Sequence, residues 1–360
     1  GLEPAVQRSV LEAKVEELQR SLNLEEGPLL RLAWFDLGGM TEGRLLLIVH
    51  HIVIDAISWP LLLGDFATAL RQVRQGKAPH LPAKTHSFKQ WADQLTQYAR
   101  SRITENERAF WLDPRRDEAA RLPLDFPEGD NLRASAQNVF ITWEQADTQA
   151  LLDFARATQS GADEVLLVVL GLALMQWAGQ GKWLINVERH GREDISADLN
   201  FSRTVGWFAN ISPLLLELSV ENSAAEAFSA AKAQMRAIPH RGIGYGLLRY
   251  MSDPEIGAAL VKQPQAEVFF NYFGQQGGII TKPQGQLSIG TLVSQQAVRR
   301  HLIEINAGIQ QDQLSMRISY GANLHARATV ENFAGQIVNA YREVIAIADP
   351  LSITGDGKIS

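Results

Sequence analysis

The chain has 360 residues, of which 46% are hydrophobic and 21% charged, a composition that predicts a folded protein large enough for two domains. Acidic residues outnumber basic ones by 40 to 34, and no dense run of lysine and arginine occurs, so a typical nucleic-acid-binding protein is excluded. The apolar stretches are too short to span a membrane, and we expect a cytoplasmic protein. The chain has no cysteine, which excludes disulfides and thiol catalysis.

The first part of the chain predicts a helix, two strands and a second helix. Apolar residues at helical spacing predict a helix over 4–22, and apolar runs predict paired strands over 29–35 and 45–54. We expect both strands to be buried on both faces, with a turn at 37–40 between them. Ser58 is a candidate N-cap of the next helix, whose apolar stripe predicts that the helix packs inward.

A stretch rich in Pro, Asp, Arg and Glu over 112–133 has the composition of a linker. We therefore divide the chain into domains 1–125 and 126–360. The second domain alternates predicted strands and helices, which indicates a mixed α/β fold. Its predicted strands are 138–143, 183–187, 267–273, 301–307 and 314–320, and its predicted helices are two over 144–178 and one over 330–347.

The first group of polar residues that could carry chemistry is His50-His51-Ile52-Val53-Ile54-Asp55-Ala56-Ile57-Ser58-Trp59. Two imidazoles stand at the end of a predicted buried strand, and a carboxylate follows them. Because neighbouring strand residues point to opposite faces, only one imidazole can face a given site. A pair of hydrogen-bonded core histidines is the alternative interpretation. A metal site is disfavoured because no third ligand lies at a recognised spacing.

A second polar group, Glu188-Arg189-His190-Gly191-Arg192-Glu193-Asp194, follows the predicted strand 183–187. A solvent-exposed turn is the alternative interpretation of this run. Three further segments combine aromatic residues with glycine. They are Ser202-Arg203-Thr204-Val205-Gly206-Trp207-Phe208, Pro239-His240-Arg241-Gly242-Ile243-Gly244-Tyr245-Gly246 and Phe269-Phe270-Asn271-Tyr272-Phe273-Gly274.

Together these segments resemble, in order, the motifs of epimerization domains of nonribosomal peptide synthetases, which belong to the condensation superfamily. They are similar to HHxxxDxxSW, EGHGRE, RTVGWF, PxxGxGYG and FNYxG. The resemblance implies two chloramphenicol acetyltransferase-like lobes in a V shape, with the active site in the cleft between them. Few residues precede His50, so we expect the N-terminal lobe to be incomplete in this sequence.

The resemblance also implies a role for each candidate residue. It makes His51 and Glu188 catalytic acid/base groups. It gives supporting or structural roles to His50, Asp55 and Arg192, and it places Ser58, Trp59, Tyr245, Asn271 and Tyr272 in contact with the substrate.

One residue departs from the motif: Arg189 stands where the family has glycine. If glycine serves there for a positive φ, arginine would store backbone strain of about 1–3 kcal/mol beside Glu188. Otherwise Arg189 adopts ordinary backbone geometry. A guanidinium facing Glu188 would also favour the carboxylate form.

The function implied is inversion of the α-carbon of an aminoacyl or peptidyl thioester. The substrate would arrive on the 4′-phosphopantetheine arm of a peptidyl carrier protein, and the domain itself would bind no cofactor and no metal. Neighbouring synthetase modules would be its other partners, with no nucleic acid and no membrane. Two alternatives stay open, a condensation domain that forms a peptide bond and an inactive domain of the same fold that recruits partners.

Overall fold

The computed structural model describes residues 3–38, 43–193, 195, 199–276, 293–347 and 358–359. The chain forms two compact units, each built from separate segments of sequence. The first unit comprises residues 1–90, 198–208 and 282–295, and the second comprises 91–197, 209–281 and 296–360. The expected boundary near residue 125 therefore falls inside the second unit, where Asp125 N donates to the carbonyl of Leu324 and anchors the supposed linker.

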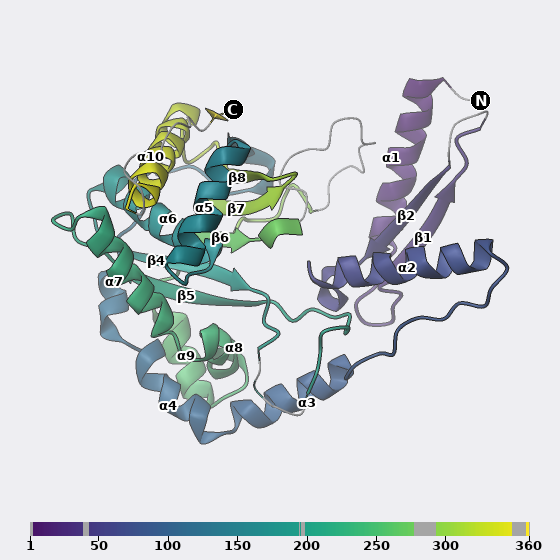
Figure 1. Ribbon diagram of the computed structural model, residues 1–360, viewed down its shortest axis with the longest axis horizontal. Coiled ribbons are helices and arrows are strands. Elements are labelled where there is room, and N and C mark those ends of the chain that lie inside the picture. The colour runs from purple at the N-terminus through teal and green to yellow at the C-terminus, as the bar shows by residue number, and fades with distance from the viewer. Residues whose placement is uncertain are drawn as a thin grey trace. The chain divides into compact units, whose positions relative to one another are not determined.

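The described residues of the first unit include two complete α-helices, α1 and α2, and a two-stranded antiparallel sheet (Figure 1). Leu30 pairs with Val49 and Phe35 with Arg44, which sets the register. Of the expected turn between the strands, Gly39 and Met40 lie outside the described residues. The elements are α1 (Pro4–Arg20), β1 (Leu30–Phe35), β2 (Arg44–Val49) and α2 (Ser58–Arg74).

Three expectations for this unit are wrong. The strand predicted over 45–54 ends at Val49, and a short 3₁₀ helix, His51–Val53, follows it. The strands are not buried on both faces, because side chains in β1 alternate between exposed and half-buried positions, as a sheet covered on one face requires. The apolar stripe of α2 does not pack inward either. Four of its members are exposed: Leu63, Phe66, Leu70 and Val73.

The second unit is a seven-stranded mixed sheet with helices on one face (Figure 1). The strand order is β5-β4-β6-β7-β8-β3-β9, and β4, β6 and β7 run parallel to one another. The strands are β3 (Ala136–Thr142), β4 (Lys182–Arg189), β5 (Asn210–Glu217), β6 (Val268–Tyr272), β7 (Ile303–Gln310), β8 (Gln313–Gly321) and β9 (Lys358–Ile359).

The helices of the second unit fall into two groups by what they contact. Those that pack with the sheet and with one another are α5 (Gln145–Ala157), α6 (Ala162–Ala178), α7 (Ala224–Arg236) and α10 (Arg327–Ile345). The others are α4 (Arg102–Trp111), α8 (Ile243–Tyr250) and α9 (Pro254–Lys262), with α8 against β5. Helix α3 (Phe88–Ala99) begins in the first unit and ends in the second.

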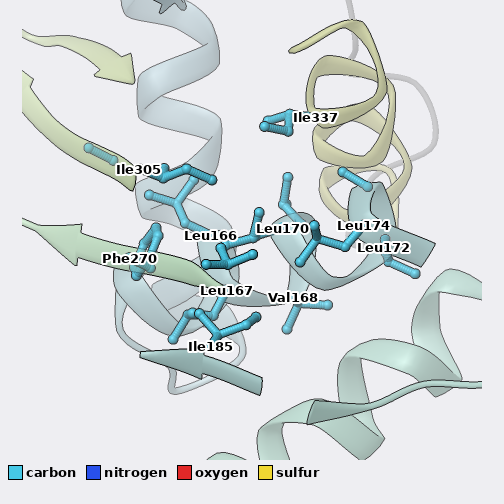
Figure 2. Close-up of a cluster of buried hydrophobic side chains, with 14 of the residues drawn as sticks. Leu166, Leu167, Val168, Leu170, Leu172, Leu174, Ile185, Phe270, Ile305 and Ile337 are labelled. Atoms are coloured by element: carbon cyan, nitrogen blue, oxygen red, sulfur yellow. The ribbon is translucent and has the colours of Figure 1, made fainter. Parts of the chain in front are cut away.

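The core of the second unit lies between the sheet and the helices α5, α6, α7 and α10. Helix α6 is apolar on every side and is buried from Val165 to Leu174, because it packs against the sheet, α7 and α10 at once. Figure 2 shows its side chains between Ile185, Phe270 and Ile305 of three strands and Ile337 of α10. Among the described residues, no single helix is long and apolar enough to span a membrane.

Candidate active site

The candidate histidines lie where β2 ends and the chain turns toward α2. His50 N donates to the carbonyl of Leu29, which closes the sheet. The Nδ1 atom of His50 accepts a hydrogen bond from Ile52 N at 3.1 Å and caps the 3₁₀ turn. The next residue, His51, is exposed. The two imidazoles therefore have different surroundings: the ring of His50 caps the turn, and the ring of His51 is exposed. Strand alternation is not the reason for this difference, because β2 ends at Val49, before both residues.

Asp55 and Ser58 form a buried hydrogen-bonded pair at the start of α2. Asp55 Oδ1 accepts from the backbone nitrogen of Ser58 at 2.8 Å and from its hydroxyl at 2.7 Å. The hydroxyl of Ser58 also lies within hydrogen-bond distance of the carbonyl and the nitrogen of Gly206, and Asp55 Oδ2 accepts from Phe208 N. Both side chains thus join the histidine segment to the loop that contains Gly206 and Phe208.

Ser58 was expected to contact the substrate, but its side chain is fully buried. A buried hydroxyl forms its hydrogen bonds with protein groups, here Asp55 and Gly206, and is not available to a substrate. We therefore assign Ser58 a structural role together with Asp55. Trp59, the other expected contact from this segment, is half-buried in the first turn of α2.

The loop 203–208 places an aromatic ring beside His51. The ring centroids of His51 and Trp207 are 5.3 Å apart and the planes are tilted by 54°. Arg203 anchors the loop through an ion pair with Asp65 of α2, in which Arg203 Nη2 lies 2.7 and 2.8 Å from the two carboxylate oxygens. A Cβ at position 206 would approach the Phe88 ring to 2.3 Å, so only glycine fits there. Sequence reasoning gave Trp207 no role, although the loop motif was the signal for it.

In the second unit, Glu188 lies near the end of β4 and shares a face of the sheet with Asn271. The parallel register places Glu188 opposite Asn271 of β6. Strand alternation puts Val187 and Arg189 on the other face, and Val187 is buried in the core there. Glu188 and Asn271 are both half-buried. They are polar residues of this sheet face in the second unit.

Arg189 has extended strand geometry, paired with Asn210 of β5, and its φ is not positive. Its guanidinium donates to Ser212 Oγ at 3.2 Å on the helix-covered face. Burial lowers the pKa of Arg189, an effect that Asp163 partly offsets. The residue that needs a left-handed conformation in this turn is Gly191, with φ at 66°. Arginine at position 189 is therefore accommodated without backbone strain.

Two tyrosines among the candidate residues of the second unit lie in packed surroundings. Tyr272 follows Asn271 but points to the core face, and burial raises its pKa to about 12. Tyr245 packs on Trp111 with ring centroids 5.2 Å apart, and its hydroxyl accepts from Arg249. Tyr272 and Tyr245 thus contribute to packing.

The last candidate, Arg192, lies in the turn after β4. Its backbone nitrogen donates to His190 Nδ1 at 3.0 Å, which closes the turn. Asp194, from the same polar run, lies outside the described residues.

The sequence pattern of the family described as "Condensation domain" matches residues 3–352. A linear gramicidin synthase chain of Brevibacillus parabrevis is 39% identical over 351 residues, a match that covers 95% of this chain and 4% of that protein. Tyrocidine synthase 1 of the same organism is 38% identical over 276 residues, which covers 76% of this chain and 25% of that protein. The chain therefore spans only a small part of the curated relatives it matches.

Two solved structures bear on the fold. The epimerization domain from the third module of tyrocidine synthetase B superposes with a TM-score of 0.84 at 32% identity, covering 94% of this chain and 77% of that one. VibH, a condensation enzyme, superposes with a TM-score of 0.69 at 18% identity, covering 97% and 78%. The second similarity concerns the fold alone. The mixed α/β fold expected from the sequence is confirmed by these matches.

Proposed function

Because this chain belongs to the condensation-domain family, we propose that it is an epimerization domain of a nonribosomal peptide synthetase. The substrate is an aminoacyl or peptidyl thioester on the phosphopantetheine arm of a peptidyl carrier protein. The reaction removes the proton from the α-carbon next to the thioester carbonyl, forms an enolate-like intermediate and returns a proton to the opposite face. The domain requires two acid/base groups for this inversion and no cofactor of its own.

The observation that carries the proposal is the similarity to the solved epimerization domain of tyrocidine synthetase B. The condensation enzyme VibH shares less identity and a lower TM-score. Ser58, which belongs to the motif ending typical of epimerization domains, is fixed by hydrogen bonds to Asp55 and Gly206. The same motif ends in Trp59.

The chemistry of the half-buried carboxylate and the exposed imidazole fits the two roles. His51 presents an exposed ring beside Trp207, where it has access to a substrate. Glu188 lies on the polar sheet face next to Asn271, whose amide can donate a hydrogen bond to a carbonyl or enolate oxygen. We assign proton transfer to His51 and Glu188 and oxyanion stabilisation to Asn271. Positioned acid/base groups contribute about 10²- to 10⁴-fold each.

The test is deuterium exchange at the α-carbon in D₂O. A carrier protein loaded with an L-aminoacyl or peptidyl group is incubated with the domain, and the released acid is analysed for label and chirality. We expect deuterium in both enantiomers without added pyridoxal phosphate, metal or nucleotide. A peptide bond formed with a second loaded carrier, with no label at the α-carbon, would instead identify a condensation domain.

The roles of His51 and Glu188 are tested with His51→Ala and Glu188→Gln, each of which should reduce exchange by about 100-fold or more. The matched control is His80→Ala, because His80 is exposed and lies outside the site. His50→Ala should lower the stability, since the side chain caps the turn before α2. Wild-type exchange in a folded His51→Ala protein would disprove the assignment.

A further inference from the structure

The polar face of the second unit's sheet contains a row of four side chains that begins with Glu188. The register aligns Glu188 with Asn271, Asn271 with Asn306 and Asn306 with Arg317, across β4, β6, β7 and β8. The neighbours of Asn306 and Arg317 along their strands, Ala307 and Met316 among them, are buried in the core on the opposite face. All four residues of the row are half-buried. Arg317 lies three strand spacings from Glu188, about 14 Å.

The guanidinium of Arg317 has no ion pair or hydrogen bond with any described residue, and its Nε atom is buried. The nearest carboxylate on this face, Glu304, is already used: its Oε2 accepts from Arg133 at 3.1 Å and lies 3.8 Å from Arg299. The positive charges of Arg133, Arg299 and Arg317 therefore all interact with the single carboxylate of Glu304. An excess of positive charge at partly dehydrated positions favours binding of an anion.

A neighbouring imidazole, that of His301, lies close to the same arginines. His301 is buried beside the row, and Asn186 Nδ2 lies 2.9 Å from its Nε2. Burial, together with the charges of nearby arginines such as Arg299, lowers the pKa of His301 to about 4. An amide nitrogen can only donate, so Nε2 accepts and carries no proton. This side chain therefore stays neutral among the arginines and adds no further positive charge.

We propose that Arg317 forms an oxyanion-binding subsite about 14 Å from Glu188 on the same sheet face, which holds a negatively charged group of the carrier-bound substrate. The inference rests on the proposed function, because it uses the thioester substrate of an epimerization domain. A substrate of this class has two possible oxyanions: the phosphate of the phosphopantetheine arm and a side-chain carboxylate of the acyl group. Arg317 is a specificity residue and takes no part in proton transfer.

The experiment measures α-deuterium exchange with four soluble thioesters. L-Phenylalanyl pantetheine and L-phenylalanyl 4′-phosphopantetheine differ only in the phosphate. Pantetheine thioesters of L-glutamyl-L-phenylalanine and L-glutaminyl-L-phenylalanine differ only in the carboxylate. If the phosphate binds at Arg317, the first pair differs in kcat/KM by about tenfold for the wild type. If a carboxylate binds there, the second pair differs by that amount.

The variant is Arg317→Gln, which keeps a polar side chain of similar length. It should abolish the discrimination seen for the wild type and leave the rate with the thioester that lacks the anionic group within about twofold. Because Arg317 has no partner among the described residues, the melting temperature should not fall. The matched control, Arg156→Gln, alters an exposed arginine of α5, on the helix-covered face, and should keep the discrimination.

The two proposals fail in different ways. If the wild type exchanges none of the four thioesters and no carrier-bound substrate, the proposed function is wrong. If the wild type exchanges the thioesters that lack the anionic group but discriminates in neither pair, or if Arg317→Gln discriminates as the wild type does, the subsite is wrong and the proposed function stands.

Discussion

Arg189 illustrates, at the scale of one residue, how backbone geometry decides whether a substitution is harmful. Glycine in a motif signals either a positive φ or a close approach of another atom. Arg189 has neither, because it is paired in β4 and its side chain reaches Ser212. Glu188 faces the other side of the sheet. The guanidinium of Arg189 therefore points away from the carboxylate of Glu188, and we expect the same pH dependence of exchange with glycine at position 189.

We expect Arg189→Gly to keep the α-proton exchange rate within about twofold and to lower the free energy of unfolding by about 1 kcal/mol. The loss in stability combines the missing hydrogen bond to Ser212 with the greater freedom of glycine in the unfolded chain. Denaturant unfolding and deuterium exchange on the same preparation measure the two quantities. A tenfold loss of exchange without loss of stability would mean that Arg189 contacts the substrate or the carrier protein.

At the scale of elements, helix α8 contains two glycines of its motif, Gly244 and Gly246, that look equivalent in the sequence. A Cβ at position 244 would approach Glu107 Oε2 to 1.9 Å, whereas one at position 246 would meet nothing within 4 Å. Glu107 is buried and accepts from Trp111 Nε1 at 3.0 Å, so it has little freedom to move. Gly244 is therefore needed for the packing of α4 against α8.

Gly244→Ala should lower the free energy of unfolding by about 1–3 kcal/mol through overpacking. Gly246→Ala is the matched control in the same helix. It should raise stability by up to about 1 kcal/mol, because alanine is the better helix former. Thermal and denaturant unfolding measure both. Equal stabilities of the two variants would contradict the packing argument.

The elements also show what the sequence could and could not predict. Strands with clear apolar runs, such as β4 and β8, were predicted within a few residues. β5 was missed because Pro213 interrupts its pattern, although proline is tolerated in an edge strand, and β5 is at the edge of the sheet. The motif around His51 was recognisable, but the burial of Ser58 depends on Gly206, which is 148 residues away in the chain.

At the scale of the whole molecule, the division into two units could not be predicted from local composition. Residues 198–208 belong to the first unit although both flanking segments belong to the second. Contacts such as Arg203 with Asp65 and Phe208 with Asp55 determine this membership, and each joins residues more than a hundred positions apart. The proline-rich stretch that suggested a linker is instead bonded to the second unit, through Leu122 N and Glu267.

The stability of the molecule should depend on pH through the buried His301. Its pKa is lowered to about 4 in the folded state, mainly by burial, from an ordinary value of 6.5. As the pH falls below 6.5, His301 becomes protonated in the unfolded chain but stays neutral in the folded chain. The unfolded state is thereby stabilised, and the free energy of unfolding falls. Between about pH 6.5 and pH 5 this loss amounts to roughly 2 kcal/mol. Glu107 acts in the opposite direction, because burial raises its pKa and favours folding in acid.

We therefore expect the unfolding free energy of His301→Gln to fall less between about pH 7 and pH 5 than that of the wild type, by about 2 kcal/mol. The comparison uses the slope with pH, since the variant also loses the contacts of the imidazole with Asn186 and Phe269 at every pH. His80→Gln, at an exposed position, is the control and should keep the wild-type slope. Denaturant unfolding at half-unit pH intervals measures the effect. Parallel curves for the wild type and His301→Gln would show that His301 is protonated alike in the folded and unfolded chains, and the lowered pKa of His301 would be disproved.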